Sequence, residues 1–549
     1  MAYECPPEFK DRSKLPACGN TSRPQILSDN YPVGAIVISV PDSESVKLDP
    51  MQQSYELIYN MAKYQDQLPL FVLPMTSAQF NTLKSKLMNS NLDSAAKTRL
   101  MERLAHAEVN QSYNWQQDYM QATVGSNGQP QLRENKLYSV RRPEVSDHFG
   151  AVSKVLEKCG VSTGEPLTPP GYIEAKNVPN GASGGNIEAL PDGSCLIGDD
   201  AFPTKQHYDK FVAHICDPKD NIKVPTHFLD VGHTDEIMKI LPKPNGKEPC
   251  NFTVAIASPD LAMELLVKKG TDRFISPENI PPEHSNKEDM LSVRREVNAS
   301  LKRICNDLDV QKYPYDRDAA PDDPGGVNSH SYFRFLDRIL TVMNSLAYAQ
   351  AIDEEEIEEI LNRQSDSFFE GKSIADAESE VAAIIKAEDS SILDAEAAAK
   401  KGAAATVTCS NATNKDLANL FRDNKDLSRA SKYVQQHMDL LEAEVSQKLR
   451  AKYPGCNIEI TKFPQLFEGT FDSTGKLSKA NSINPNPTNS VVIGKHVYIP
   501  DQNNSAFQQD LREKMQKMGL IPHFVNTFEF AHSMNGNLHC STQTIPLCR

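Results

Sequence analysis

Three short stretches of the chain carry residue types that covalent acid–base chemistry uses: residues 114–119 (NWQQDY), 231–236 (VGHTDE) and 535–541 (NGNLHCS). Together they offer a thiol that can act as a nucleophile, an imidazole that can move protons, and carboxylates that can bind a cation. In the middle stretch His233 and Asp235 stand two positions apart, so on an extended segment their side chains would point to the same side.

Each stretch taken alone also has an ordinary structural explanation. A histidine after a strand is more often a hydrogen-bonded structural residue, and a lone cysteine near a chain end is seldom a nucleophile. Trp115, the only tryptophan of the chain, is at even odds a core residue. The interpretation therefore depends on the combination of the three stretches.

In combination the three stretches resemble the catalytic domain of the protein-arginine deiminases. The tryptophan followed by Gln-Asp, the Val-Gly-His-x-Asp-Glu block and the terminal His-Cys occur in the order of that family. Residues 184–188 (GGNIE), 462–467 (KFPQLF) and 484–486 (NPN) resemble further family segments. The resemblance extends over roughly residues 31–270 and 430–549. It implies an α/β pentein fold, a pseudo-fivefold propeller of ββαβ modules.

The resemblance also implies a role for four residues. Asp118 and Asp235 would bind the guanidinium group, His233 would be the general acid and base, and Cys540 the nucleophile. The implied reaction converts arginine in peptides or proteins to citrulline and ammonia through a covalent thiouronium on the cysteine. A planar guanidinium suits this set, because its fixed donors pair best with carboxylates. We expect the two carboxylates to raise the pKa of the Cys540 thiol until a cation binds.

Substrate contacts outside this set are less clearly marked by the sequence. Trp115 is a candidate to pack against the aliphatic stem of the arginine. Family members often carry a basic residue that holds the substrate backbone where this chain has Met534. Arg133 is the candidate substitute.

Calcium is a ligand of the vertebrate relatives, and the sequence predicts that this chain has lost most of that site. Tyr119 and Gln121 stand where the relatives place acidic ligands. Gln117 and Glu188 match other ligands, so one weak calcium site could survive. Calcium needs six to eight oxygen ligands, and we expect the chemistry to require no cofactor.

Two other functions stay open at this stage. A deiminase of free arginine, agmatine or another small guanidino compound would use the same chemistry with a more closed pocket. A catalytically inactive binding protein could keep the fold, although such a protein has no need to retain the cysteine.

Composition limits the choice of partners. The formal net charge is -15, with 73 acidic and 58 basic side chains, which argues against nucleic-acid binding because that needs a basic face. No apolar run reaches the length of a membrane span. We therefore expect a soluble protein whose partner is an arginine-containing peptide or protein. The oligomeric state stays open.

The eleven cysteines are not spaced like a structural zinc site, since no Cys-x-x-Cys pair occurs. Cys5 and Cys18 could form a disulfide, which would indicate an oxidising compartment, or both could be reduced thiols. No signal peptide is visible in the sequence. The compartment stays open, with export after removal of a signal segment as one alternative.

The elements that would position these residues follow an α/β pattern. Short apolar runs predict strands, and each precedes or follows a segment with helical spacing. The predicted strands are 33–40, 69–74, 194–197, 226–231, 252–257, 490–499 and 523–525, and the predicted helices are 50–63, 205–214, 259–268 and 506–518. Residues 1–30 are expected to be an irregular leader before a catalytic domain at 31–549. A mostly helical insertion at about 290–445 is expected to interrupt that domain, because its composition favours helix.

Overall fold

The computed structural model describes residues 3–272 and 413–548 apart from short gaps. The gaps are 17–24, 29, 41–50, 126–127, 170–182, 200–201, 203, 217–218, 220, 245–250, 424, 457, 472–475, 528–530 and 533–535. Most of the predicted helical insertion, and Met534, therefore lie outside the described residues. Everything below concerns the described part of the chain.

Five small mixed sheets repeat one pattern of strands. In each, a central strand pairs antiparallel with one neighbour and parallel with the strand that follows a helix. This is the ββαβ module that the sequence predicts, and the predicted α/β fold is confirmed.

The first three modules include the strands that come from both ends of the described chain. Module one is β19 (Thr542–Pro546), β2 (Val33–Ile38), α1 (Gln52–Tyr64), β3 (Leu70–Met75) and β4 (Leu104–Glu108). Module two is β5 (Met120–Val124), β6 (Pro130–Glu134), α6 (Pro143–Glu157) and β7 (Ser162–Thr163), with β1 (Gln25–Ile26) beside β5. Module three is β8 (Ile187–Ala189), β9 (Cys195–Gly198), α7 (Lys205–Ile215) and β10 (Ile222–Val224).

A long helix belongs to module four, and a separate hairpin lies between modules four and five in the sequence. Module four is β11 (Met238–Pro242), β12 (Phe252–Ser258), α8 (Pro259–Lys268) and β13 (Ile460–Pro464), with α13 (Asn414–Asp423) and α14 (Lys425–Lys452) before β13. Module five is β16 (Val491–Ile493), β17 (His496–Pro500), α15 (Ser505–Met518) and β18 (Ile521–Val525). The hairpin is β14 (Phe467–Phe471) with β15 (Leu477–Ser482).

Five helices of the first two modules remain to be placed. They are η1 (Pro7–Phe9), α2 (Ser77–Asn89), α3 (Ser94–Arg103), α4 (Gln116–Tyr119) and α5 (Lys136–Arg141).

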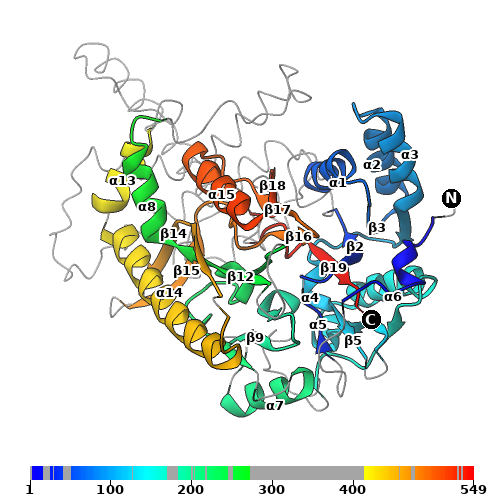
Figure 1. The fold of residues 1–549 in the computed structure, drawn as a ribbon, viewed down its shortest axis with the longest axis horizontal. Helices are drawn as coiled ribbons and strands as arrows, with labels where there is room; N and C mark the ends of the chain where they lie inside the picture. The colour runs from blue at the N-terminus through cyan, green and yellow to red at the C-terminus, as the bar shows by residue number, and fades with distance from the viewer. Residues whose placement is uncertain are drawn as a thin grey trace, which may run out of the picture. The chain divides into compact units, whose positions relative to one another are not determined.

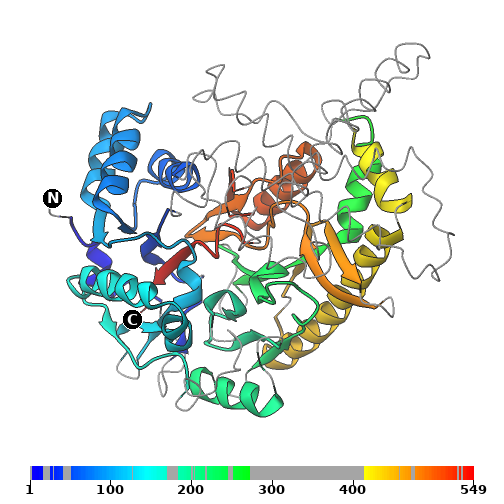
Figure 2. The same ribbon diagram turned by 180° about the vertical axis from the view of Figure 1, so that it is seen from behind.

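Hydrophobic clusters join the modules into a closed cycle. Each cluster holds buried residues of two successive modules, and the fifth cluster joins the last module to the first. Pairs of residues that mark the five junctions are Val37 with Leu132, Ile26 with Ile187, Leu196 with Ile240, Leu241 with Val497 and Tyr498 with Phe71. This cycle of five modules is the pentein arrangement, with strands inside and helices such as α1, α7 and α14 around them (Figures 1 and 2).

Local sequence explains why the modules form, as module five illustrates. The hairpin between β16 and β17 turns at Gly494, whose φ of 60° suits a residue without a side chain. Asn504 caps α15 because its side-chain oxygen accepts from the backbone N–H of Ala506 at 3.0 Å and of Phe507 at 3.1 Å. The helix ends at Gly519, which has a left-handed φ of 80°. The single strand predicted at 490–499 is thus a hairpin, and the predicted helix is confirmed.

The strand predicted at 226–231 is wrong. The parallel strand of module three is β10, and the predicted residues form turns with one isolated bridge from Leu229 to Ala480. The apolar residues Phe228 and Leu229 are buried, but burial inside a turn gives the same apolar pattern as a strand. Sequence alone could not separate the two.

The end of the predicted helical insertion is core structure. Helix α14 contributes Val434, Met438 and Leu441 to the cluster between modules three and four. These residues recur at helical spacing, which buries one face of α14 against the sheets.

The N-terminal segment packs against module two. Phe9 and Leu15 are buried in the cluster that joins modules one and two, and Cys5 forms a disulfide with Cys159 at the end of α6. The suggested pairing of Cys5 with Cys18 is therefore wrong. The segment reaches a partner 154 positions away, which sequence proximity could not indicate.

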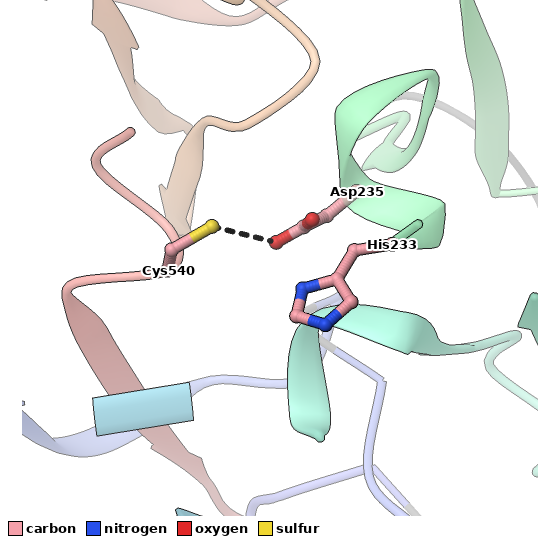
Figure 3. Close-up of side chains that lie close together, drawn as sticks. All are labelled: His233, Asp235 and Cys540. Atoms are coloured by element: carbon pink, nitrogen blue, oxygen red, sulfur yellow. Dashed lines mark hydrogen bonds between the residues drawn. The ribbon is translucent and has the colours of Figure 1, made fainter. Parts of the chain in front are cut away.

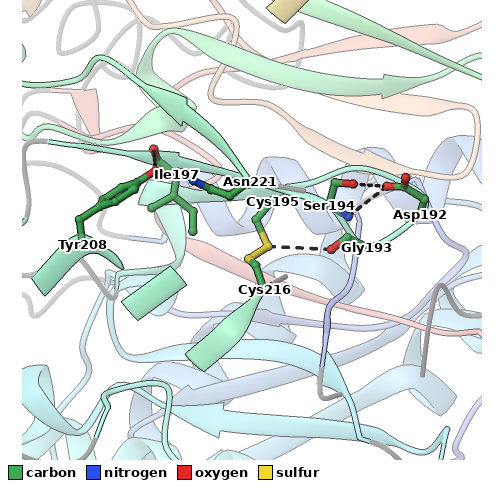
Figure 4. Close-up of a disulfide and its surroundings, with 8 residues drawn as sticks. All are labelled: Asp192, Gly193, Ser194, Cys195, Ile197, Tyr208, Cys216 and Asn221. Atoms are coloured by element: carbon green, nitrogen blue, oxygen red, sulfur yellow. Dashed lines mark hydrogen bonds between the residues drawn. A yellow bond between two sulfur atoms is a disulfide. The ribbon is translucent and has the colours of Figure 1, made fainter. Parts of the chain in front are cut away.

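A second disulfide lies within module three. Cys195 of β9 is bonded to Cys216, which follows the last residue of α7 (Figure 4). Cys456 and Cys548 each take part in a further disulfide. Among the described cysteines, Cys540 is the free one, and it is buried. No helix in the described ranges is long and apolar enough to cross a bilayer.

Candidate active site

Cys540 lies in the turn directly before β19, where the chain enters the first module. Asn489 holds it there: the side-chain oxygen of Asn489 accepts from the backbone N–H of Cys540 at 3.2 Å and of His539 at 2.8 Å. The amide nitrogen of the same side chain donates to the Cys540 sulfur at 3.1 Å. The orientation of the thiol is therefore set by module five.

Asp235 meets this cysteine from a different part of the chain. Its Oδ2 atom lies 3.6 Å from the Cys540 sulfur (Figure 3). The same oxygen lies 2.8 Å from Nδ1 of His539. Asp235 is fully buried in the short 3-10 helix η5 (Thr234–Glu236), and its second oxygen, Oδ1, hydrogen-bonds to no described protein atom. That oxygen is available to a ligand.

Hydrogen bonds from two other modules hold the η5 turn. Thr234 donates to the backbone oxygen of Asn186 at 3.1 Å, and Thr488 donates to the backbone oxygen of Asp235 at 3.0 Å. The segment is therefore a helical turn rather than the extended stretch that the spacing predicted.

His233 lies directly before this turn. One ring nitrogen of His233, an oxygen of Asp235 and the sulfur of Cys540 all lie within 4.8 Å of one another, and Figure 3 shows the imidazole beside the carboxylate. The Nδ1 atom is buried and bonds to no described protein atom. Imidazole, thiol and carboxylate are also zinc-ligand types, so this is the described group best suited to a soft metal ion.

A close backbone approach makes room for these side chains. A Cβ atom on Gly185 would lie 2.8 Å from Nδ1 of His233 and 3.0 Å from Oδ2 of Asp235. Gly185 belongs to η3 (Gly184–Asn186), in the GGNIE segment of the sequence. A larger residue at this position would displace the two catalytic candidates.

Asp118 joins the same group from α4. Burial raises the pKa of its carboxyl, and the negative charge of Asp235 adds to that effect. Nearby His233, a hydrogen bond from Tyr138 and the positive charge of Arg142 act in the opposite direction. The two carboxylates, contributed by modules two and four, therefore interact electrostatically.

The thiol is strongly protonated in this setting. Burial raises the pKa of Cys540 well above its ordinary value, and the charges of Asp235 and Asp118 raise it further. Hydrogen bonds from Asn537 and Asn489 lower the pKa only in part. The direction agrees with the expectation that the carboxylates keep the thiol protonated while no cation is bound.

The two predicted substrate contacts differ in their placement. Trp115 packs on Gly536, where an added Cβ would lie 2.3 Å from the indole ring, so the indole lies close to the segment that ends in Cys540. Arg133 is 2 % exposed, and its guanidinium donates to the backbone oxygens of Glu165 and Pro166. None of the bonds described for Arg133 goes to Asp118, Asp235 or Cys540, so the structure does not bring it to the site.

A different arginine lies beside Asp118. Arg142 is exposed, lies over the rings of Tyr113 and Tyr138, and exerts its charge on Asp118. Only the tertiary structure picks it out, because nothing in its local sequence separates it from Arg141.

Gln117 and Glu188, the residues that could have kept one weak calcium site, are engaged by other side chains. The Lys239 ammonium lies 3.0 Å from Oε1 of Glu188, and both side chains are buried. Gln117 bonds through its amide nitrogen to Nε2 of His539 at 2.9 Å. A calcium ion on Glu188 would have to stand beside an ammonium, so the residues present do not fit it.

Sequence reasoning used His539 as part of the terminal His-Cys motif but gave it no role, and it missed Asn489 and Lys239. For Lys239 a signal existed, since a lysine between Met238 and Ile240 interrupts an otherwise apolar strand. Asn489 is visible only from its contacts.

Residues 370–547 match the model of the family described as protein-arginine deiminase. The chain is 30% identical over 130 residues to protein-arginine deiminase type-4 of Mus musculus, which is 23% of this chain and 19% of that protein. It is 27% identical over 137 residues to protein-arginine deiminase type-3 of Homo sapiens, covering 24% and 19%. The matched region thus spans about a fifth of the length of these curated relatives.

Two solved structures align with nearly the whole chain at low identity. An agmatine deiminase of Enterococcus faecalis has a TM-score of 0.45 at 10% identity, covering 96% of this chain and 98% of that one. A C. jejuni agmatine deiminase has a TM-score of 0.44 at 10% identity, covering 96% and 97%. The fold assignment rests on the five ββαβ modules, and the sequence matches establish that this chain resembles the protein-arginine deiminase family as its motifs predict.

Proposed function

We propose that this protein hydrolyses the guanidinium group of arginine, giving citrulline and ammonia. One observation carries the proposal: a free buried thiol, an imidazole and a carboxylate, Cys540, His233 and Asp235, meet within 4.8 Å. Asp118 adds a second carboxylate, which both Cys540 and Asp235 sense. Two carboxylates and a nucleophile at one point suit a planar cation better than a neutral substrate.

Substrate binding would lower the pKa of the Cys540 thiol and so generate the nucleophilic thiolate. The guanidinium is held by Asp118 and Asp235, whose Oδ1 bonds to no described protein atom. Its positive charge offsets the carboxylates that raise the pKa of the Cys540 thiol, so the thiolate becomes accessible only when the cation is present. Binding and activation are thereby one event.

The reaction then proceeds in two steps. The thiolate attacks the central guanidinium carbon, a C–S bond forms, and His233 donates a proton to the nitrogen that leaves as ammonia. Water, deprotonated by the now neutral His233, attacks the resulting thiouronium, and the C–S bond breaks. The hydroxyl proton of the tetrahedral adduct is lost as the C–S bond breaks. A guanidinium cation and one water therefore give a neutral ureido group and one ammonium ion, which is ammonia plus that proton.

Peptide or protein arginine is the substrate class we favour, because of Arg142. Its exposed guanidinium lies near the carboxylate that would bind the head group. There it could donate to the backbone carbonyl of an arginine residue. Agmatine has no carbonyl at this position, so Arg142 favours a substrate that carries one.

A colorimetric ureido assay tests the proposal with benzoyl-arginine amide, free arginine and agmatine, using Cys540→Ala as the blank. We expect turnover of benzoyl-arginine amide with a kcat/KM well above that for the two small compounds. Preference for agmatine or free arginine would assign the chain to small guanidino compounds instead. Absence of turnover with all three would favour a binding protein that keeps the fold.

A further inference from the structure

A buried lysine, Lys239, is linked through His539 to Asp235, one of the two carboxylates proposed to bind the guanidinium. It takes no part in the proposed reaction. Lys239 is fully buried in β11, with its ammonium 3.0 Å from Oε1 of Glu188 and 2.9 Å from Nε2 of His539. Burying a charged amine costs several kcal/mol unless it is paired and hydrogen-bonded. Lys239 meets that condition through Glu188 and His539, so the ammonium and these two partners hold one another in place.

Lys239 fixes which nitrogen of His539 carries the proton. An ammonium donates and never accepts, so Nε2 of His539 must be the acceptor and the ring proton must lie on Nδ1. Nδ1 is the atom 2.8 Å from Oδ2 of Asp235. The lysine thus obliges a neutral His539 to donate to the carboxylate that lies 3.6 Å from the nucleophile.

Gln117 connects His539 to the segment that carries the second carboxylate, Asp118. The Gln117 amide nitrogen lies 2.9 Å from Nε2 of His539, where it shares the single lone pair of that nitrogen with Lys239. The backbone N–H of Gln117 donates to the Cys540 carbonyl at 3.3 Å. Gln117 directly precedes Asp118. One buried cation therefore connects the segments that carry both carboxylates and the cysteine.

We propose that Lys239 is a built-in cation that positions Asp235 through His539, beside Gln117 and Glu188, the residues that could have kept one weak calcium site. The proposal rests on the proposed function, in which Asp235 binds the guanidinium. An ammonium fixed by Glu188 needs no divalent ion to order these three segments. It also occupies the one carboxylate that such an ion would require, so this chain keeps its site assembled without metal.

The test compares the wild-type protein with Lys239→Met/Glu188→Gln, which removes both partners and leaves no unpaired buried charge. The matched control is Lys243→Met/Glu459→Gln, a pair formed by the residue that follows β11 and the residue that precedes β13, whose atoms are 3.7 Å apart and whose side chains are partly exposed. Each protein is measured for Tm with calcium and with EGTA. Each is then measured for kcat and KM on benzoyl-arginine amide across pH.

We expect the Tm and activity of the wild-type protein to be the same in calcium and in EGTA. The Lys239 double variant should stay folded yet lose about 10- to 100-fold in kcat/KM, the usual cost of removing a partner that orients a binding group. Most of the loss should be in KM, because Asp235 is no longer held for the guanidinium. The control should match the wild-type protein.

A pH readout separates positioning from simple stability. Without Lys239, the neutral ring of His539 can move its proton to Nε2 and turn an acceptor toward Asp235. The loss in kcat/KM should therefore deepen as pH rises through the ordinary histidine range, about 6–7. In the wild-type protein Lys239 prevents that change.

Two results would overturn the inference. One is a rise of wild-type Tm or activity on adding calcium, which needs no variant to be observed. The other is a double variant with the wild-type kcat/KM and pH profile. If the wild-type protein turns over no guanidine compound, the proposed function fails by itself. The pH dependence of Cys540 alkylation by chloroacetamide then replaces turnover, and an unchanged profile in the double variant overturns the inference.

Discussion

Asn489 holds Cys540 at two points. Its side-chain oxygen accepts from the Cys540 backbone N–H at 3.2 Å, and its amide nitrogen donates to the sulfur at 3.1 Å. Asn489 precedes β16 in module five, whereas Cys540 lies in the turn before β19 of module one. The junction between the last module and the first therefore orients the proposed nucleophile.

Replacing Asn489 should weaken catalysis without removing the thiol. We expect Asn489→Ala to lower kcat by roughly 10²-fold, since a misplacement of about 1 Å can cost that much. Asn489→Asp keeps the acceptor for the two backbone N–H groups but adds a negative charge, so it should raise the thiol pKa further. Measuring kcat for both, with chloroacetamide rates at several pH values, separates position from charge. A wild-type kcat in Asn489→Ala would show that the contact is incidental.

Cys540→Ala and Cys540→Ser should abolish turnover while keeping the Tm of the wild-type protein. A neutral hydroxyl is a far poorer nucleophile than a thiolate. A haloacetamidine, which carries a guanidinium-like head, should alkylate Cys540 before any other cysteine, and peptide mass spectrometry identifies the site. Labelling of another cysteine first, or substantial activity in either variant, would contradict the assignment.

Asp118→Asn and Asp235→Asn should each lower kcat/KM by two to three orders of magnitude. Removing one partner of a desolvated charge pair costs about 2–5 kcal/mol. The control is Asp209→Asn, whose carboxylate is half exposed and pairs with Lys205 on the surface of α7. A loss below tenfold for either active-site variant would place the guanidinium clamp elsewhere.

The raised pKa of Cys540 gives a pH signature. The thiolate is the reactive form, so alkylation by neutral chloroacetamide should stay slow at pH 7 and rise with pH beyond the ordinary thiol range, about 8.5. Asp235→Asn removes a charge that raises this pKa, so its profile should move to lower pH. A cationic haloacetamidine should react at lower pH than the neutral reagent. Identical profiles for wild-type protein and variant would mean that Asp235 does not act on the thiol.

Arg142→Ala should reduce the preference for peptide substrates. We expect a higher KM for benzoyl-arginine amide, with little change for any residual activity on agmatine, because only the former has a peptide carbonyl near the head group. Arg142→Lys should recover part of the loss, since lysine keeps the charge but not the planar donors. Equal effects on both substrates would assign Arg142 to the electrostatics of Asp118 alone.

The sequence by itself determined the residue types of the site and the repeating α/β elements. His233, Asp235 and Cys540 are recognisable from short motifs, and the helices 259–268 and 506–518 agree closely with α8 and α15. Apolar spacing and caps such as Asn504 act over one or two turns of the chain. Information of that range can be read without the fold.

The tertiary structure decided everything that depends on segments meeting across the chain. Asn489 and Lys239 gained their roles only when modules five and four brought them to residues 539 and 540. Cys5 is bonded to Cys159 rather than to Cys18, and Arg133 is buried against two backbone carbonyls. Glu188, which could have served one weak calcium site, pairs with Lys239. A hydrogen bond or ion pair is set by angstrom-scale placement of both partners, and no local pattern encodes a partner hundreds of residues away.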